Sequence, residues 1–308
     1  MAINHILNGS QFADKKLLKK IFQKASQLQI LDLTGKMPQL LKGKVIATVF
    51  YEPSTRTRLS FEAGALKLGA GVISVANAGQ TSSAVKGESL EDAIKVTGGF
   101  CDCVVLRHPE NGSAERAAVV CPVPVINAGD GYNQHPTQAL YDLYTIEKEL
   151  GKIDGLKIAF LADFRFQRHI HSIVPMFCQY KHLELFFVVP KELRMPEEYK
   201  IQLKKAGVKF QEMDSVNEVL PEVDVLYATR VFKERFSDEA EYERLKKSFF
   251  IGTNTVSKMK KRSIIMHVMP RIYEVDPEVD KDPRAAYFRQ AKNGMYVRAA
   301  LLLYALGL

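Results

Sequence analysis

The sequence predicts an α/β protein built from two doubly wound parallel-sheet domains with a cleft between them. Apolar, β-branched runs alternate with amphipathic helical stretches along the chain of 308 residues. A glycine-bracketed turn at 151–155 divides these runs into two groups. The composition, 46% hydrophobic and 25% charged, is that of a globular protein and excludes intrinsic disorder, collagen and coiled coil.

Strands are predicted where short apolar runs are bounded by turn residues. They are 44–51, 72–75, 103–106 and 123–127 before the turn, and 156–162, 183–189, 208–211, 224–229 and 263–267 after it. Amphipathic spacing predicts helices over 54–68, 90–100, 114–120, 136–150, 169–180, 197–205 and 239–248. Strands that alternate with helices form parallel sheets with helices on both faces.

The turn at 151–155 sets the predicted domains, which are 1–150 and 151–283. The helical stretch 284–308 is expected to return and pack on the first domain, and Gly98-Gly99 is expected to mark a helix end. In open parallel sheets, ligands bind beyond the carboxyl ends of the strands. The site is therefore expected where strand ends of both domains meet.

Composition narrows the function classes. The cysteines Cys101, Cys103, Cys121 and Cys178 form no C-x-x-C pair, so neither a zinc site nor a disulfide framework is expected. The net charge is +8, and the lysine clusters have no aromatic residues between the lysines. This pattern favours small anionic substrates over nucleic acid as binding partners. No apolar run reaches bilayer length, and the opening residues do not resemble a signal peptide, so we expect no membrane contact and a cytoplasmic protein.

The strongest motif follows the first predicted strand and reads Pro53-Ser54-Thr55-Arg56-Thr57-Arg58. Proline ends the strand, and Ser54 or Thr55 can cap the helix that follows. The first turn of that helix offers unpaired N–H groups, hydroxyls and two guanidinium groups. Two arginines at a helix N-terminus oppose its dipole unless an anion compensates, so the motif predicts phosphate binding.

This motif resembles the phosphate signature of the carbamoyltransferases, and the chain is similar to aspartate carbamoyltransferase catalytic chains over essentially its whole length. The other matching segments are Lys86–Leu90, Leu106–Pro109, Asn127–Gly131, His135–Gln138, Thr229-Arg230, Lys233–Phe236 and Arg284–Ala291. The resemblance implies that the first domain, with 284–308, binds carbamoyl phosphate and that the second binds the amino acid.

The implied reaction uses no cofactor and no metal. The α-amine of aspartate attacks the carbonyl carbon of carbamoyl phosphate, which gives carbamoyl aspartate and phosphate for pyrimidine synthesis. Such a reaction needs donors aimed at an oxyanion and fixed positive charge at the leaving phosphate.

The resemblance also assigns residues. Phosphate is implied to bind Ser54, Thr55, Arg56, Thr57 and Arg107, while Thr57, Arg107 and His135 polarise the carbonyl oxygen. Gln138 and the backbone carbonyls of Val268 and Met269 would hold the carbamoyl amide, and Arg168, Arg230, Phe232 and Pro270 lie on the aspartate side.

The residue types of the polar segment 77–87, considered without the family resemblance, predict a mobile surface loop. In the family this loop reaches the neighbouring subunit's site, which implies a homotrimer with shared sites. Ser82 and Lys86 would then contact carbamoyl phosphate in the next subunit, and Lys86 would also meet the acceptor carboxylate.

The acceptor side departs from the family pattern. Relatives usually have Gly-Asp-Leu-Lys-x-Gly-Arg-Thr where this chain has Ala162-Asp163-Phe164-Arg165-Phe166-Gln167-Arg168-His169. They also have glutamine at Phe232 and proline at Val268. Losing a hydrogen bond to a charged group at Phe232 would cost about 1.5–3 kcal/mol.

Three explanations remain open: retained use of aspartate with adjusted contacts, a changed amine acceptor, or a homologue that binds carbamoyl phosphate and turns it over poorly. Arg168 and Arg230 persist as carboxylate anchors, which favours aspartate. Ornithine would be repelled by both arginines, and the ornithine-enzyme motifs are missing. The alternative that is not an enzyme is a non-catalytic trimer that binds carbamoyl phosphate. The sequence leaves open whether regulatory chains or a dihydroorotase accompany the protein.

Overall fold

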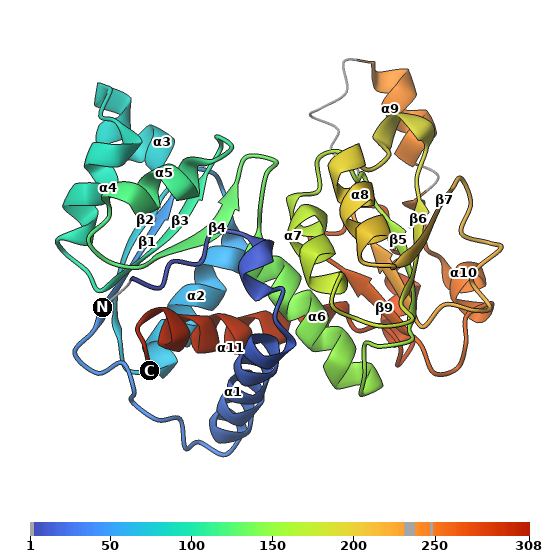
Figure 1. The fold of residues 1–308 in the computed structure, drawn as a ribbon, viewed down its shortest axis with the longest axis horizontal. Helices are drawn as coiled ribbons and strands as arrows, with labels where there is room; N and C mark the ends of the chain where they lie inside the picture. The colour runs from blue at the N-terminus through green and yellow to red at the C-terminus, as the bar shows by residue number, and fades with distance from the viewer. Residues whose placement is uncertain (1–2, 231–237, 247–248) are drawn as a thin grey trace. The chain divides into compact units, whose positions relative to one another are not determined.

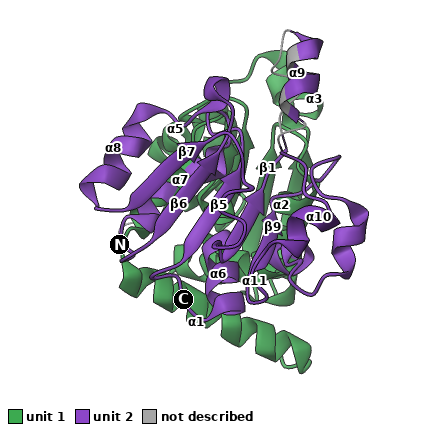
Figure 2. Ribbon diagram, turned by 90° about the vertical axis from the view of Figure 1, so that its right-hand side faces the viewer, with its two compact units in different colours: residues 1–141, 171–173, 292–308 green, residues 142–170, 174–291 purple. Residues whose placement is uncertain are grey.

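The computed structural model describes residues 3–230, 238–246 and 249–308 and divides the chain into two compact units. Unit 1 comprises residues 1–141, 171–173 and 292–308, and unit 2 comprises 142–170 and 174–291, as Figure 2 shows. The contacts divide the chain within helices α6 (Pro136–Leu150) and α11 (Tyr287–Ala305), whereas the predicted boundaries lie at 150/151 and 283/284. No helix among the described residues combines the length and apolarity that a membrane span requires.

Unit 1 contains a parallel sheet, sheet A, in the order β2-β1-β3-β4. Its strands are β1 (Val45–Phe50), β2 (Gly71–Ala76), β3 (Cys103–His108) and β4 (Val125–Asp130). Figure 1 shows α4 (Leu90–Gly98) and α5 (Ser113–Val120) on one face and α2 (Thr55–Lys67) on the other. The unit also contains α1 (Lys15–Leu33), α3 (Ala78–Thr81) and the 3₁₀ helices η1 (Gly9–Phe12) and η2 (Ser83–Lys86).

Unit 2 contains a second parallel sheet, sheet B, in the order β7-β6-β5-β8-β9. Its strands are β5 (Lys157–Leu161), β6 (Glu184–Val188), β7 (Lys209–Met213), β8 (Val225–Ala228) and β9 (Ile264–His267). Its helices include α7 (Arg168–Phe177), α8 (Glu197–Lys205), α9 (Glu239–Lys246) and α10 (Thr253–Ser257), with 3₁₀ helices η3 (Lys191–Leu193) and η6 (Pro277–Lys281).

Each sheet buries its own apolar core. The central strands β1 and β3 and the edge strand β4 are buried along almost their whole length. In unit 2 the ring of Phe164 lies 4.9 Å from that of Phe187, and Phe160 lies 5.3 Å from Tyr227. The first contact is edge-to-face and the second is tilted, and both belong to the buried core of unit 2.

The two parallel sheets and all nine predicted strands are confirmed. The predicted helix end at Gly98-Gly99 is also confirmed, since α4 ends at Gly98. Helix α1 was missed as an element, although its buried residues Leu18, Ile21, Phe22, Ala25 and Leu28 have helical spacing. Predicted helix 169–180 is shorter than expected, because α7 covers Arg168–Phe177.

Candidate active site

In unit 1 the candidate phosphate residues lie where β1 ends and α2 begins. Ser54 is the residue that precedes the first turn of α2, and its side chain makes no capping hydrogen bond. The hydroxyl instead accepts a hydrogen bond from Nη1 of Arg107 at 3.3 Å. Thr57 is buried, whereas Thr55 and Arg56 are exposed. The helix start therefore presents hydroxyls beside a guanidinium group, which is a suitable arrangement for an anion.

Arg107 reaches this position because β1 and β3 are paired, with Phe50 opposite Arg107 in the register. Its Nε donates to Oε2 of Glu52 at 3.2 Å, and its side chain is 15% exposed. Glu52 fixes the guanidinium plane and leaves donor capacity on the terminal nitrogens, since a guanidinium group carries five N–H donors. The structure thus brings together Ser54 and Arg107, which are far apart in the sequence.

The second arginine of the motif has a structural role. Nη1 of Arg58 donates to Oε1 of Glu62 at 3.1 Å and to Oγ of Ser74 at 2.9 Å. Glu62 also accepts from Thr48 at 2.8 Å. Glu62 therefore supplies an anionic partner for Arg58 within unit 1. Arg56, the other arginine of the motif, is exposed.

His135 and Gln138 lie at the start of α6, after β4. The backbone N–H of His135 donates to Oγ of Ser172 at 2.8 Å, and that hydroxyl donates to Oε1 of Gln134 at 2.7 Å. Oε1 of Gln138 accepts from the hydroxyl of Tyr141 at 2.5 Å. Both predicted residues are nearly fully buried, at 5% and 6% exposure. The neighbouring hydrogen bonds thus hold both segments in place.

Ser82 and Lys86 lie on the loop of unit 1 that contains α3 and η2. The Ser82 hydroxyl donates to the carbonyl of Ala78 at 2.5 Å and accepts from the N–H of Ala84 at 3.2 Å. Lys86 is exposed and makes no side-chain hydrogen bond or ion pair to any described residue. The structure does not join either residue to Ser54 or Arg107.

In unit 2 the candidate residues for the acceptor and for the carbamoyl amide follow three neighbouring strands. Arg168 begins α7 after β5, Arg230 follows β8, and Val268, Met269 and Pro270 follow β9. All therefore lie at the carboxyl edge of sheet B, where ligands of parallel sheets bind. Phe232 lies outside the described residues.

The loop after β9 is held by a buried pair of side chains. Nδ1 of His267 accepts from the N–H of Met269 at 2.8 Å, so its proton is on Nε2, which faces Oε2 of Glu274 at 3.7 Å. Burial alone would raise the pKa of Glu274, but the His267 ring and the backbone N–H of Ile272 outweigh burial and lower it. Met269 has φ +52°, an unfavourable backbone angle that this pair helps to maintain.

Two further groups of unit 2 bear on the acceptor side. Gln167 is 4% exposed, and its Nε2 donates to the backbone carbonyl of Arg230 at 3.0 Å. Burial raises the pKa of Asp163 to about 6, although the N–H of Arg165 donates to Oδ1 at 3.2 Å. The histidines of α7, His169 and His171, are buried.

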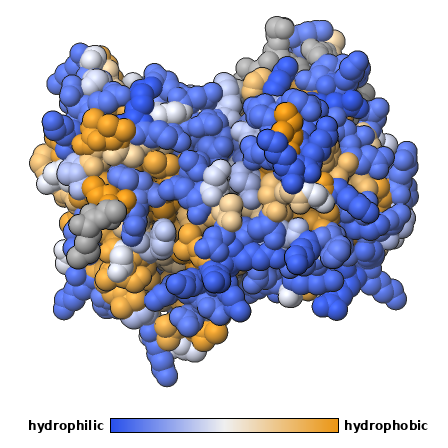
Figure 3. Space-filling view, viewed as in Figure 1, coloured by the Kyte–Doolittle hydropathy of each residue, from blue (hydrophilic) through white to orange (hydrophobic). Residues whose placement is uncertain are grey.

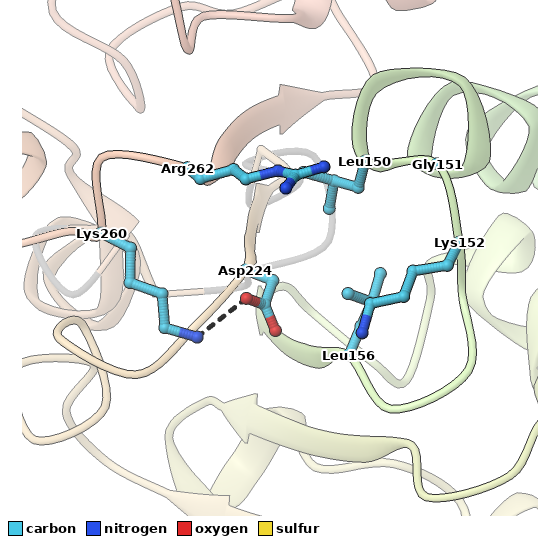
Figure 4. Close-up of a pocket in the computed structure, with 7 residues that line it drawn as sticks. All are labelled: Leu150, Gly151, Lys152, Leu156, Asp224, Lys260 and Arg262. Carbon is cyan, nitrogen blue, oxygen red and sulfur yellow. Dashed lines mark hydrogen bonds and ion pairs between the residues drawn. The ribbon is translucent and has the colours of Figure 1, made fainter.

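A pocket of unit 2 lies away from this edge. Figure 4 shows it lined by Lys152, Asp224, Lys260 and Arg262 together with Leu150, Gly151 and Leu156. Leu156, Asp224 and Arg262 precede β5, β8 and β9, so the pocket lies at the amino edge of sheet B. It contains none of the predicted acceptor residues.

Sequence reasoning missed three contacts of this site. Glu52, Ser172 and Tyr141 each orient a predicted residue. Glu52 and Tyr141 lie next to predicted motifs, which is a usable signal. Ser172 comes from a helix 37 residues beyond His135, and no local pattern could have indicated it.

Comparisons with known proteins agree with this geometry. Residues 4–148 match the carbamoyl phosphate-binding domain of aspartate/ornithine carbamoyltransferases, and residues 154–305 match the aspartate/ornithine-binding domain. The aspartate carbamoyltransferase catalytic subunit of Methanocaldococcus jannaschii is 46% identical, with 97% of both chains covered. The chloroplastic aspartate carbamoyltransferase 2 of Pisum sativum is 44% identical, with 97% of this chain and 78% of the relative covered.

Solved structures agree as well. The catalytic subunit of M. jannaschii aspartate transcarbamoylase matches with a TM-score of 0.91 at 46% identity and 98% coverage of both chains. Aspartate transcarbamoylase of Trypanosoma cruzi, in complex with carbamoyl phosphate and aspartate, matches with a TM-score of 0.91 at 35% identity, covering 97% of this chain and 95% of that one.

The fold and the residues at the two sheet edges are those of a carbamoyl-transferring enzyme. The chain belongs to the aspartate/ornithine carbamoyltransferase family, among the aspartate carbamoyltransferase catalytic chains.

Proposed function

We propose that the chain transfers the carbamoyl group of carbamoyl phosphate to the α-amine of L-aspartate, which gives N-carbamoyl-L-aspartate and phosphate for pyrimidine biosynthesis. The observation that carries this proposal is the contact between Arg107 and Ser54 at the start of α2. It places a guanidinium group at a helix N-terminus, where a phosphate dianion gains both charge-assisted hydrogen bonds and the helix dipole.

The phosphate would be held by Ser54, Thr55, Arg56, Thr57 and Arg107. Attack of the neutral amine on the carbonyl carbon forms a C–N bond and moves an electron pair onto the carbonyl oxygen. Thr57, Arg107 and His135 are proposed to donate hydrogen bonds to that oxyanion. Collapse of the intermediate breaks the C–O bond to phosphate, which leaves with the bonding pair while the amine loses a proton.

The carbamoyl amide would donate to the side-chain oxygen of Gln138 and to the backbone carbonyls of Val268 and Met269. The Tyr141 hydroxyl already occupies one lone pair of that oxygen, which fixes the amide orientation of Gln138. The His267–Glu274 pair supports the Met269 backbone in the same way. These side chains position the donors and acceptors and do not touch the reacting atoms.

Aspartate would bind through its carboxylates to Arg168, Arg230 and Lys86, near Phe232 and Pro270. Both arginines lie at the carboxyl edge of sheet B, and a dicarboxylate needs two cationic partners. A cationic acceptor such as ornithine would meet like charge there.

A homotrimer with shared sites is part of the proposal, with Ser82 and Lys86 supplied by the neighbouring subunit. Support comes from Lys86, which is exposed and has no side-chain partner among the described residues. Unit 1 also exposes large apolar side chains, including Leu59 at 50%, Leu66 at 59% and Ile73 at 41%. Figure 3 shows hydrophobic patches on the part of the surface that belongs to this unit.

We propose the cytoplasm as the compartment of this protein. The Pisum sativum relative is named as chloroplastic, so fractionation of the source cells is the test that distinguishes the two compartments. Regulatory chains or a dihydroorotase as further partners are to be sought by co-purification.

The direct test is a steady-state assay for carbamoyl aspartate, run beside a panel of other amines scored by phosphate release. Saturable turnover with aspartate supports the proposal. Turnover confined to another amine would favour a changed acceptor, and tight binding of a phosphonate mimic without any turnover would favour a non-catalytic trimer.

A further inference from the structure

Gln167 connects two loops at the carboxyl edge of sheet B. It is the last residue before α7, and its side chain makes no capping bond to that helix. The amide instead crosses to the loop after β8, where Nε2 donates to the carbonyl of Arg230 at 3.0 Å. The two residues are 63 positions apart in the chain, and Gln167 is only 4% exposed. This hydrogen bond is therefore a partly buried tertiary link.

The link lies where the strand ladder ends. Strands β5 and β8 pair from Ile158–Val225 to Leu161–Ala228, and the N–H of Thr229 then donates to the carbonyl of Leu161 at 2.9 Å. Arg230 lies one residue further, beyond the ladder. The carbonyl of Arg230 accepts from the neighbouring Thr229 hydroxyl at 3.5 Å and from the Gln167 amide at 3.0 Å. The Gln167 amide is the one of these two donors that comes from the loop after β5, so it extends the connection between the two loops beyond the ladder.

The base of the link is itself fixed. The N–H of Gln167 donates to the carbonyl of Asp163 at 3.1 Å, and its carbonyl accepts from the N–H of Ile170 at 2.8 Å. Arg168 follows directly in the chain. The side chain of Gln167 thus connects the backbone next to Arg168 to the backbone of Arg230.

We infer that Gln167 is a positioning residue for acceptor recognition, because its amide sets the separation of the Arg168 and Arg230 backbones and so the length of dicarboxylate that both arginines can bind. The inference rests on the proposed function, which makes these two arginines the carboxylate anchors. Gln167 does not touch the substrate.

The test replaces the amide while keeping the size of the side chain. Gln167→Met is expected to raise the KM for aspartate about 5- to 10-fold, which is the affinity equivalent of one neutral hydrogen bond. The turnover number and the KM for carbamoyl phosphate are expected to change less than about twofold, since an interaction that acts on acceptor binding alone appears in one KM. The preference for succinate over glutarate as inhibitors is expected to fall in parallel.

The matched control is Gln39→Met. Nε2 of Gln39 donates to the carbonyl of Lys67 at 3.4 Å, so it makes the same type of bond in unit 1. No change in acceptor parameters is expected there. Gln167→Asn, whose amide is one methylene too short to reach Arg230, is expected to behave as Gln167→Met and carries the test if the methionine variant does not fold.

Two results separate the inference from the proposed function. If wild-type protein makes no carbamoyl aspartate, the proposed function fails, and calorimetry with succinate and glutarate still tests the role of Gln167. An unchanged KM for aspartate and an unchanged succinate-to-glutarate ratio in folded Gln167 variants would overturn the inference. Wild-type protein that binds neither diacid would also overturn it.

Discussion

Asp163 is an unusual carboxyl group, because burial outweighs the opposing charge of Arg165 and raises its pKa to about 6. A carboxyl whose folded pKa lies above its unfolded value binds more protons in the folded state between the two values, so its contribution to stability falls as the pH rises. Above the pKa of the folded state, the carboxylate is charged and its full cost to the free energy of unfolding is present. This cost amounts to at most about 3 kcal/mol for a shift of this size.

We therefore predict that Asp163→Asn stabilises unit 2 at pH 7 by about 1–3 kcal/mol. The advantage of the variant over wild type is expected to shrink as the pH falls from about 6 to about 4. Urea unfolding at several pH values measures this difference. A variant that is less stable at pH 7, or a difference that does not depend on pH, would contradict the assignment.

The His267–Glu274 pair leads to a second prediction at the same scale. Both side chains are fully buried, and Oε2 of Glu274 also accepts from the N–H groups of Ile272 and Tyr273. Glu274→Ala is expected to cost about 3 kcal/mol of unfolding free energy, because buried donors lose their acceptor. Glu274→Gln should cost clearly less. Equal stabilities of wild type and both variants in denaturant titrations would show that the pair does not hold this loop.

At the scale of elements, strands were more predictable than helices and tertiary contacts. Strands β1 and β5 were predicted to within about a residue because their apolar runs are bounded by turn residues. Helix α1 was missed as an element, although Leu18, Ile21 and Ala25 mark one apolar face among its lysines. The family resemblance assigned Arg107 and Ser54 to the same phosphate, whereas the Gln167–Arg230 link joins residues whose proximity no local pattern encodes.

The loop that contains η2 gives a prediction at this scale. If Lys86 completes the neighbouring subunit's site, then Lys86→Ala trimers mixed with Arg56→Ala trimers should regain activity after subunit exchange. In random hybrids about one site in four combines an intact Arg56 with an intact Lys86. Activity is measured before and after exchange.

The control for this experiment is each variant exchanged with itself, which should stay inactive. Hybrids that exchange, as mass spectrometry of differently tagged chains would show, and yet recover no activity would exclude a shared site.

At the scale of the whole molecule, the proposed function divides donor and acceptor binding between the two α/β units. Unit 1 contains the residues proposed to bind phosphate, which follow strands of sheet A, and unit 2 contains the two arginines proposed to bind the acceptor, which follow strands of sheet B. The net charge of +8 fits two anionic substrates. The departures from the family pattern at Ala162, Gln167 and Val268 all lie in unit 2. We therefore expect this chain to bind carbamoyl phosphate as its relatives do and to bind the acceptor through contacts that differ from theirs.

The central claim is that the start of α2 and Arg107 hold the phosphate of carbamoyl phosphate, and calorimetry with a stable phosphonate mimic tests it most directly. Arg56→Met is expected to weaken binding by about 10- to 100-fold, the loss of a charge-assisted hydrogen bond. Arg58→Met serves as the control, since Arg58 pairs with Glu62 at 3.1 Å, and is expected to leave the affinity within about twofold. Unchanged affinity in the folded Arg56 variant would contradict the account.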